Sequence, residues 1–163
     1  MTDYDEFVGG ETTDFSLVSD INQVSDAILE KASFGKIDFS GSIIDFSKLD
    51  LDSYVKIEDK IIEVNPADLG MDKLNVPVIL TFYNVFFDNP VVLRDGVECF
   101  ECAVIDGPRS DSYQTLSPGF SIYQVVDGDD LDPDFCGDGS CSLGEDCSVC
   151  SIDCGTCGGS SSG

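Results

Sequence analysis

Hydrophobic residues between positions 23 and 128 fall into short runs separated by turns, a pattern that predicts β-strands. A turn at Arg94-Asp95-Gly96 carries the Asp-Gly pair that suits a tight hairpin. Runs of this kind recur at short intervals, so we expect an all-β fold, an antiparallel Ig-like β-sandwich. The expected strands are 37–40, 43–46, 55–57, 61–64, 76–87, 91–93, 97–99, 103–105 and 120–126.

The segment before these strands has two competing interpretations. Val18, Ile21, Val24 and Ile28 fall at helical spacing, which favours one amphipathic helix. Residues 27–29, Ala-Ile-Leu, equally suit a strand. The pattern alone does not choose between them.

The net charge of the chain restricts its possible functions more than any single motif does. The 163 residues carry 32 acids, 8 bases and no histidine, for a net charge of −24. Such a surface repels phosphate backbones and anionic lipid, so we expect no nucleic-acid partner and no membrane-surface partner. It attracts hard cations such as Ca²⁺, although the acids also suit a solubility coat. Without histidine the usual general base and the usual catalytic triad are missing, so we expect no enzyme.

Composition also divides the chain. We expect an acidic linker or N-terminal strand segment over 1–22, the β-sandwich over 23–128, a cysteine-rich module over 129–157 and a flexible tail over 158–163. Eight acids and no base follow residue 128. The first residues lack the apolar core of a signal peptide, and no apolar run is long enough to span a membrane. We therefore expect a segment of a longer exported protein.

Several ordered motifs carry a resemblance. They are LEKASFGKIDF (29–39), YVKIEDKIIEVN (54–65), VPVILTFYNVFFDNP (76–90), VVLRDGVEC (91–99) and the closing FSIY (120–123). Together they resemble a β-domain that recurs in archaeal surface and secreted proteins, over about residues 27–126. The resemblance implies an extracellular location, an adhesive or structural role and no enzymatic activity.

The cysteine-rich stretch CGDGSCSLGEDCSVCSIDCGTC (136–157) is similar to short modules of secreted microbial proteins. Its acids are spaced as in a calcium loop of EF-hand type, and Gly139 stands where that loop turns sharply. Cys136 replaces an expected oxygen ligand and flanking helices are absent, so we expect an irregular Ca²⁺ loop. The alternative is that the Asp-Gly pairs only form turns. The candidate ligands are Asp134, Asp138, Ser140, Glu145 and Asp153, with Asp132 and Asp146 as further options.

The eight cysteines allow disulfides, zinc or an iron–sulfur cluster. Dense carboxylates raise thiol pKa values and oppose thiolate ligands, and a small module without its own core suits disulfides, which we favour. Cys99 and Cys102 most simply pair with each other, with a redox-active pair as the alternative. The pairing of the others stays open: Cys136, Cys141, Cys147, Cys150, Cys154 and Cys157.

We therefore expect a non-catalytic extracellular structural or adhesive module of a cell-surface protein or filament, with other surface domains or copies of itself as partners. In a filament, residues 1–22 would add a strand to a neighbour's sheet. The alternative is a glycan- or protein-binding module, which an exposed cluster of Tyr83, Tyr113 and Tyr123 would favour. An isopeptide crosslink from Lys31 or Lys36 is a further option beside ordinary solvated lysines.

Overall fold

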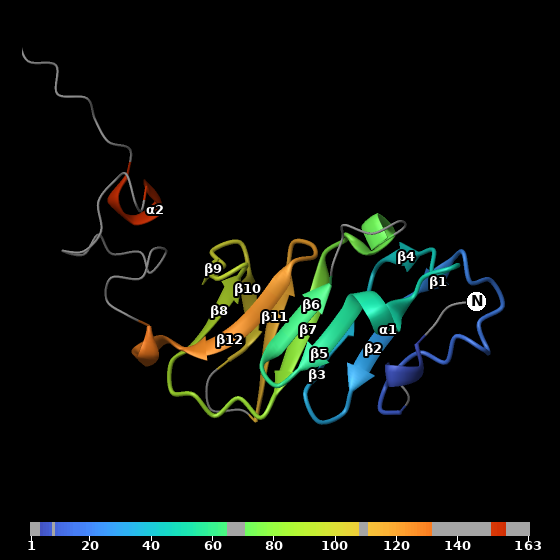
Figure 1. Ribbon diagram of the computed structural model, residues 1–163, viewed down its shortest axis with the longest axis horizontal. Coiled ribbons are helices and arrows are strands. Elements are labelled where there is room, and N and C mark those ends of the chain that lie inside the picture. Colours follow the sequence, from blue (N-terminus) through green and yellow to red (C-terminus); the bar gives the residue numbers. More distant parts are fainter. Residues whose placement is uncertain (1–3, 8, 65–70, 108–110, 132–150, 156–163) are drawn as a thin grey trace, which may run out of the picture. The chain divides into compact units, whose positions relative to one another are not determined.

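The computed structural model of the chain describes residues 4–7, 9–64, 71–107, 111–131 and 151–155. The chain folds as two compact units, Met1–Asp127 and Gly128–Gly163. Antiparallel strands are the main regular elements of the first unit, so the predicted all-β class is confirmed (Figure 1).

Two five-stranded antiparallel sheets form the body of the first unit, and β1 (Val24–Ser25) and β4 (Ile43–Ile44) pair in a third, two-stranded sheet. The first sheet has the order β10 (Ala103–Asp106), β11 (Ser112–Ser117), β7 (Val78–Tyr83), β3 (Gly35–Asp38) and β2 (Ile28–Lys31). The second has the order β5 (Val55–Glu58), β6 (Ile61–Val64), β12 (Ile122–Asp127), β8 (Pro90–Arg94) and β9 (Val97–Glu98). The other small elements are η1 (Asp5–Phe7), α1 (Leu51–Tyr54) and η2 (Met71–Leu74). In the second unit the structure describes η3 (Gly128–Asp130) and α2 (Ser151–Cys154).

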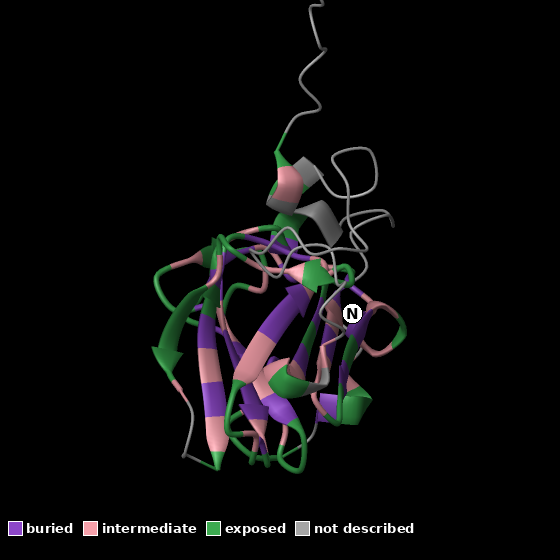
Figure 2. Cartoon of the chain, turned by 90° about the vertical axis from the view of Figure 1, so that its left-hand side faces the viewer, coloured by how far each residue is buried: buried purple, intermediate pink, exposed green. Residues whose placement is uncertain are grey.

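One hydrophobic core lies between the two five-stranded sheets, which makes the unit a β-sandwich. Alternate residues of the strands point into it, and these buried positions appear as purple bands in Figure 2. Ring contacts between Phe39, Phe46 and Phe120 extend the core, with ring centroids 5.8 Å apart in the two pairs that Phe39 makes. Because the buried set draws on both sheets, neither sheet hides its apolar face without the other.

The N-terminal residues fold back onto this sandwich. Phe7 is fully buried and Phe15 nearly so. The carboxylate of Asp52 accepts hydrogen bonds from the backbone N–H groups of Asp5 and Glu6, at 2.7 and 3.0 Å. Residues 4–22, expected as a linker or a strand segment, thus contribute core side chains to the same compact unit.

Two details differ from the sequence pattern, and one open alternative is settled. The strand β11 was not predicted, because its residues Ser-Tyr-Gln-Thr-Leu-Ser are mostly polar. The segment before the first expected strands could have been a helix or a strand, and it contains a strand, since Ile28–Lys31 pairs with β3. The long apolar run 76–87 contains a strand of six residues that ends at Tyr83, where Asn84 takes a left-handed conformation with φ of 57°.

Candidate functional site

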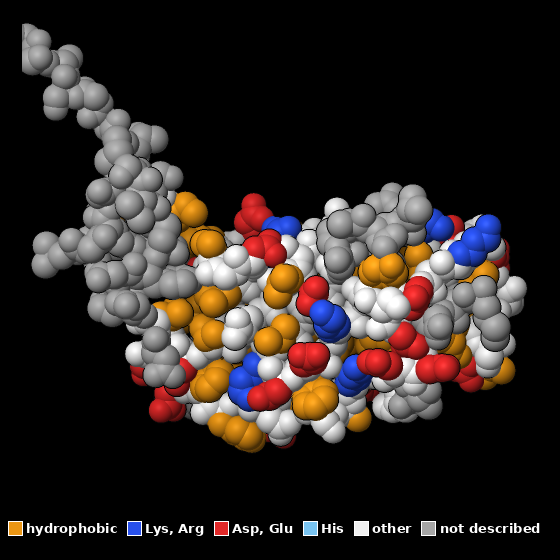
Figure 3. Space-filling view, viewed as in Figure 1, with side chains coloured by type: hydrophobic (Ala, Val, Ile, Leu, Met, Phe, Trp, Pro, Cys, Tyr) orange, Lys and Arg blue, Asp and Glu red, His pale blue; other side chains and the backbone are white. Residues whose placement is uncertain are grey.

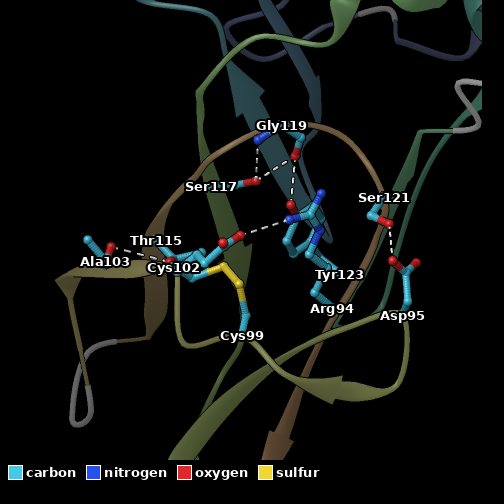
Figure 4. Close-up of a disulfide and its surroundings, with 11 residues drawn as sticks. Arg94, Asp95, Cys99, Cys102, Ala103, Thr115, Ser117, Gly119, Ser121 and Tyr123 are labelled. Carbon is cyan, nitrogen blue, oxygen red and sulfur yellow. Dashed lines mark hydrogen bonds and ion pairs between the residues drawn. A yellow bond between two sulfur atoms is a disulfide. The ribbon is translucent and has the colours of Figure 1, made fainter. Parts of the chain in front are cut away.

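The loop between β9 and β10 carries a disulfide between Cys99 and Cys102 (Figure 4). It closes a tight turn, in which the Cys102 N–H donates a hydrogen bond to the Cys99 carbonyl oxygen at 3.2 Å. Since β9 belongs to the second sheet and β10 to the first, this loop is a crossing between the two layers. Both cysteines pack against the core, so the bond pins the crossing to the sandwich.

A pocket of about 350 Å³ lies beside this disulfide. Strands of both sheets line it, because β9 is only two residues long and leaves the start of β8 uncovered toward β10. We call this pocket, with the disulfide loop and β10, the seam. The lining residues are Asn89, Pro90, Val91 and Val92 from β8 and its approach, Glu98 from β9, Cys99, Phe100 and Cys102 from the loop, and Val104, Tyr113 and Thr115 from β10 and β11.

Polar and apolar groups both line the seam, and two of its polar side chains are held by the fold. The Thr115 hydroxyl donates to the Ala103 carbonyl oxygen at 3.2 Å and so ties β11 to β10. Burial raises the pKa of Tyr113, and the nearby negative charge of Glu98 raises it further. This phenol therefore stays neutral at ordinary pH.

The surroundings of the seam are acidic. Arg94 is the only base in the sequence between Lys73 and Arg109, and its guanidinium lies 3.3 Å from the Glu101 carboxylate. The same guanidinium lies 5.9 Å from the ring centroid of Tyr123. Over the face drawn in Figure 3, acidic side chains are more frequent than basic ones and lie among hydrophobic ones. A ligand of the seam thus meets a mixed polar and apolar lining with acidic side chains nearby.

Large hydrophobic side chains at the seam remain exposed. Strand β10 is exposed at all four residues and is the wholly green strand in Figure 2. Phe100 and Val104 are each 58% exposed and Ile105 is 52% exposed. On β11, Leu116 points outward opposite Ala103. Sequence reasoning predicted strand 103–105 but not this exposure, since an apolar run ordinarily indicates burial.

Most of the predicted metal ligands lie outside the described residues: Asp134, Asp138, Ser140 and Glu145. Asp153 lies in α2. Among the residues that the structure describes, no group of three or more Cys, Asp or Glu side chains is arranged to hold a metal ion.

Of the predicted disulfide cysteines, Cys154 is bonded. Five others belong to the undescribed part of the tail: Cys136, Cys141, Cys147, Cys150 and Cys157.

The three candidate tyrosines do not form an exposed cluster. Tyr123 is fully buried, Tyr113 is 4% exposed, and the Tyr83 hydroxyl donates a 2.9 Å hydrogen bond to Glu30. Burial and this bond to a carboxylate raise the pKa of Tyr83 far above its ordinary value. These rings hold the fold together and leave no stacking platform for a sugar.

The two lysines considered for a crosslink form ion pairs. Lys31 lies 2.6 Å from Glu6, and Lys36 contacts Glu11. Both pairs join β2 or β3 to the N-terminal segment, so in this fold the lysines fasten that segment electrostatically.

The chain matches no protein-family model and has no significant match among curated proteins. Within the described ranges, no helix has the length and apolar character needed to cross a bilayer.

Proposed function

We propose that the chain is a non-catalytic, extracellular structural module of a cell-surface protein or filament. The observation that carries this proposal is the Cys99–Cys102 disulfide at the crossing between the sheets. Disulfides persist in oxidising compartments and are rare where thiols are kept reduced. A sandwich with a single buried core and a pinned crossing resists deformation, as a structural module must.

An Ig-like topology for the sandwich is part of this proposal, and the strand order supports it. Strands β7 to β12 follow one another as the B, C, C′, D, E and F strands of an Ig domain do: β10-β11-β7 matches D-E-B, and β12-β8-β9 matches F-C-C′. The earlier strands β3 and β6 take the places of A and G. The Tyr123 hydroxyl bonds to the Gly119 carbonyl four residues upstream, as the tyrosine corner of such sandwiches does.

The second unit completes the proposed module as a disulfide-rich, calcium-binding tail. Its support is the resemblance of 136–157 to modules of secreted microbial proteins, together with eight acids and no base after residue 128. A divalent cation offsets the repulsion among those carboxylates, which disulfides by themselves leave in place. The recurrent β-domain of archaeal surface proteins remains the family that we propose for the first unit.

A second candidate function is protein binding by a secreted module. The exposed apolar side chains around the seam favour it, since contiguous apolar exposure marks interaction surfaces. Glycan binding has less support, because Tyr113 and Tyr123 are buried.

Thiol counting tests the proposed function. The protein is isolated from its native cells, unfolded without reductant in the presence of an alkylating reagent, and weighed by mass spectrometry. We expect no alkylated cysteine. A Cys99→Ser variant is the matched control, since it leaves Cys102 without its partner and must gain one alkyl group. Several alkylated cysteines in the unaltered protein, together with its recovery from the cytoplasm, would contradict export.

A further inference from the structure

The sandwich has four edge strands, and three of them are protected. The edge of β2 is covered by Thr12, whose hydroxyl accepts from the Glu30 N–H and donates to the Glu30 carbonyl. Strand β5 carries the charged residues Lys56 and Glu58 at its exposed positions, and β9 has only two residues. Charge, shortness and coverage are the ways in which proteins keep sheet edges from pairing.

Strand β10 differs from these three edges. Among the described residues no strand lies on its outer side. Its sequence Ala-Val-Ile-Asp is exposed throughout, and the first three residues are apolar. Its protective features are confined to its end: a register shift between Val104 and Asp106, and the charge of Asp106 itself. An exposed apolar edge of this kind is a template for strand addition.

The seam pocket lies on the inner side of this edge. Val104 is opposite Thr115 in the β10–β11 register, and both line the pocket. Since side chains alternate across a strand, a strand added to β10 would direct every second side chain toward the pocket. Backbone pairing and contacts with the exposed side chains of Phe100 and Val104 would thus act together, and the added strand would cover the exposed edge of the first sheet.

The acidic side chains near β10 indicate the charge of the partner that would bind there. Glu98 lines the pocket and Asp106 ends β10, whereas Glu101 of the disulfide loop is already paired with Arg94. We propose that β10 pairs with an extended strand of another protein in which apolar residues alternate with Lys or Arg. A second copy of this chain is disfavoured, because two molecules of net charge −24 repel each other. This inference rests on the proposed structural role, and it specifies the kind of partner that the module would bind.

The test uses the full chain and a synthetic peptide that alternates valine and lysine, with binding followed by amide NMR. We expect the peptide to bind, with the largest shifts at Ala103–Asp106 and with affinity that falls as salt is added. Two control peptides separate the contributions: one has glutamate in place of lysine, and one is N-methylated so that its backbone cannot donate. Each control peptide should bind at least about tenfold more weakly than the lysine peptide.

Val104→Ser and Phe100→Ser should each lower the affinity for the lysine peptide about tenfold. Both changes remove exposed apolar contacts without altering the core. Ile43→Ser is the matched control, since Ile43 is also an exposed aliphatic strand residue but lies on β4. Three outcomes would each overturn the proposal. The control peptides could bind as tightly as the lysine peptide, or the NMR shifts could lie away from β10. The chain could also form a dimer that Val104→Ser dissociates. The thiol count that tests export does not involve this surface. The two proposals, export and strand addition, can therefore be contradicted independently of each other.

Discussion

The hydroxyl of Tyr123 donates a 2.6 Å hydrogen bond to the carbonyl oxygen of Gly119, and Tyr123 is fully buried. The bond spans the corner at which the chain passes from β11 in the first sheet to β12 in the second. Ser117, also buried, donates its hydroxyl to the same carbonyl at 2.7 Å. Three residues thereby fix the direction in which β12 enters its sheet.

Tyr123→Phe should lower the free energy of unfolding by about 1 kcal/mol, because one buried hydrogen bond is lost while Ser117 still satisfies the Gly119 carbonyl. Urea denaturation measures the change. Tyr4→Phe is the control, since its exposed 3.4 Å contact with Asp14 should contribute less than about 0.5 kcal/mol. Adding Ser117→Ala to Tyr123→Phe should cost more than the two single changes together, because the carbonyl then has no donor. Strict additivity would contradict a shared acceptor.

The N-terminal segment should be essential to stability. Phe7→Ala should lower the free energy of unfolding by about 3–5 kcal/mol, the range for removing a fully buried aromatic side chain. Phe86→Ala makes the same chemical change at a side chain that is 76% exposed, so it should fall within about 0.5 kcal/mol of the unaltered protein. Similar values for the two variants would mean that residues 4–7 do not pack on the sandwich in solution.

Acid should weaken the fold through Asp45. A hydrogen bond from Lys73, at 2.7 Å, and hydrogen bonds from Ser47 lower the pKa of Asp45 from 3.8 to about 2. The unfolded chain therefore takes up this proton at higher pH than the folded one. The associated stability is present above pH 3.8 and is lost as the pH falls toward about 2.

Titration of the Asp45 carboxyl carbon by NMR measures this pKa directly. Lys73→Gln should raise the midpoint, because the largest contribution is removed. Lys60→Gln breaks a different exposed pair, with Asp59, and should leave the Asp45 midpoint unchanged. A midpoint near the ordinary 3.8 in the unaltered protein would show that the Lys73 contact does not persist in solution.

Calcium should stabilise the second unit. If the tail binds Ca²⁺ through Asp134, Asp138 and Glu145, the melting temperature should rise as calcium reaches about 10⁻⁴–10⁻³ M, the range of extracellular modules. Magnesium should substitute poorly, since it demands a tighter geometry and gives up water reluctantly. Glu145→Gln should abolish the response, whereas Glu101→Gln, an exposed acid of the sandwich, should preserve it. A melting temperature that ignores both calcium and chelator would leave the acids as a solvated coat.

The apolar strands were predictable because aliphatic residues at β spacing have few other ways to bury their surface. Strand β11 escaped prediction because polar residues fill its inward positions. Thr115 and Ser117 are buried there, and each donates its hydroxyl to a backbone carbonyl. A buried hydroxyl costs free energy unless the fold supplies an acceptor, and that acceptor cannot be read from the neighbouring residues.

The sequence by itself determined the β class, the strand positions over most of residues 35–106, the acidic character and the local cysteine pair. All of these follow from near neighbours in the chain: residue alternation, turn chemistry and short spacing. Only the tertiary structure decided that Phe7 and Phe15 belong to the core, that β6 pairs with β12, and that β10 stays exposed. These outcomes depend on contacts between residues far apart in the chain, because burial and pairing are settled by which surfaces meet when the two sheets pack.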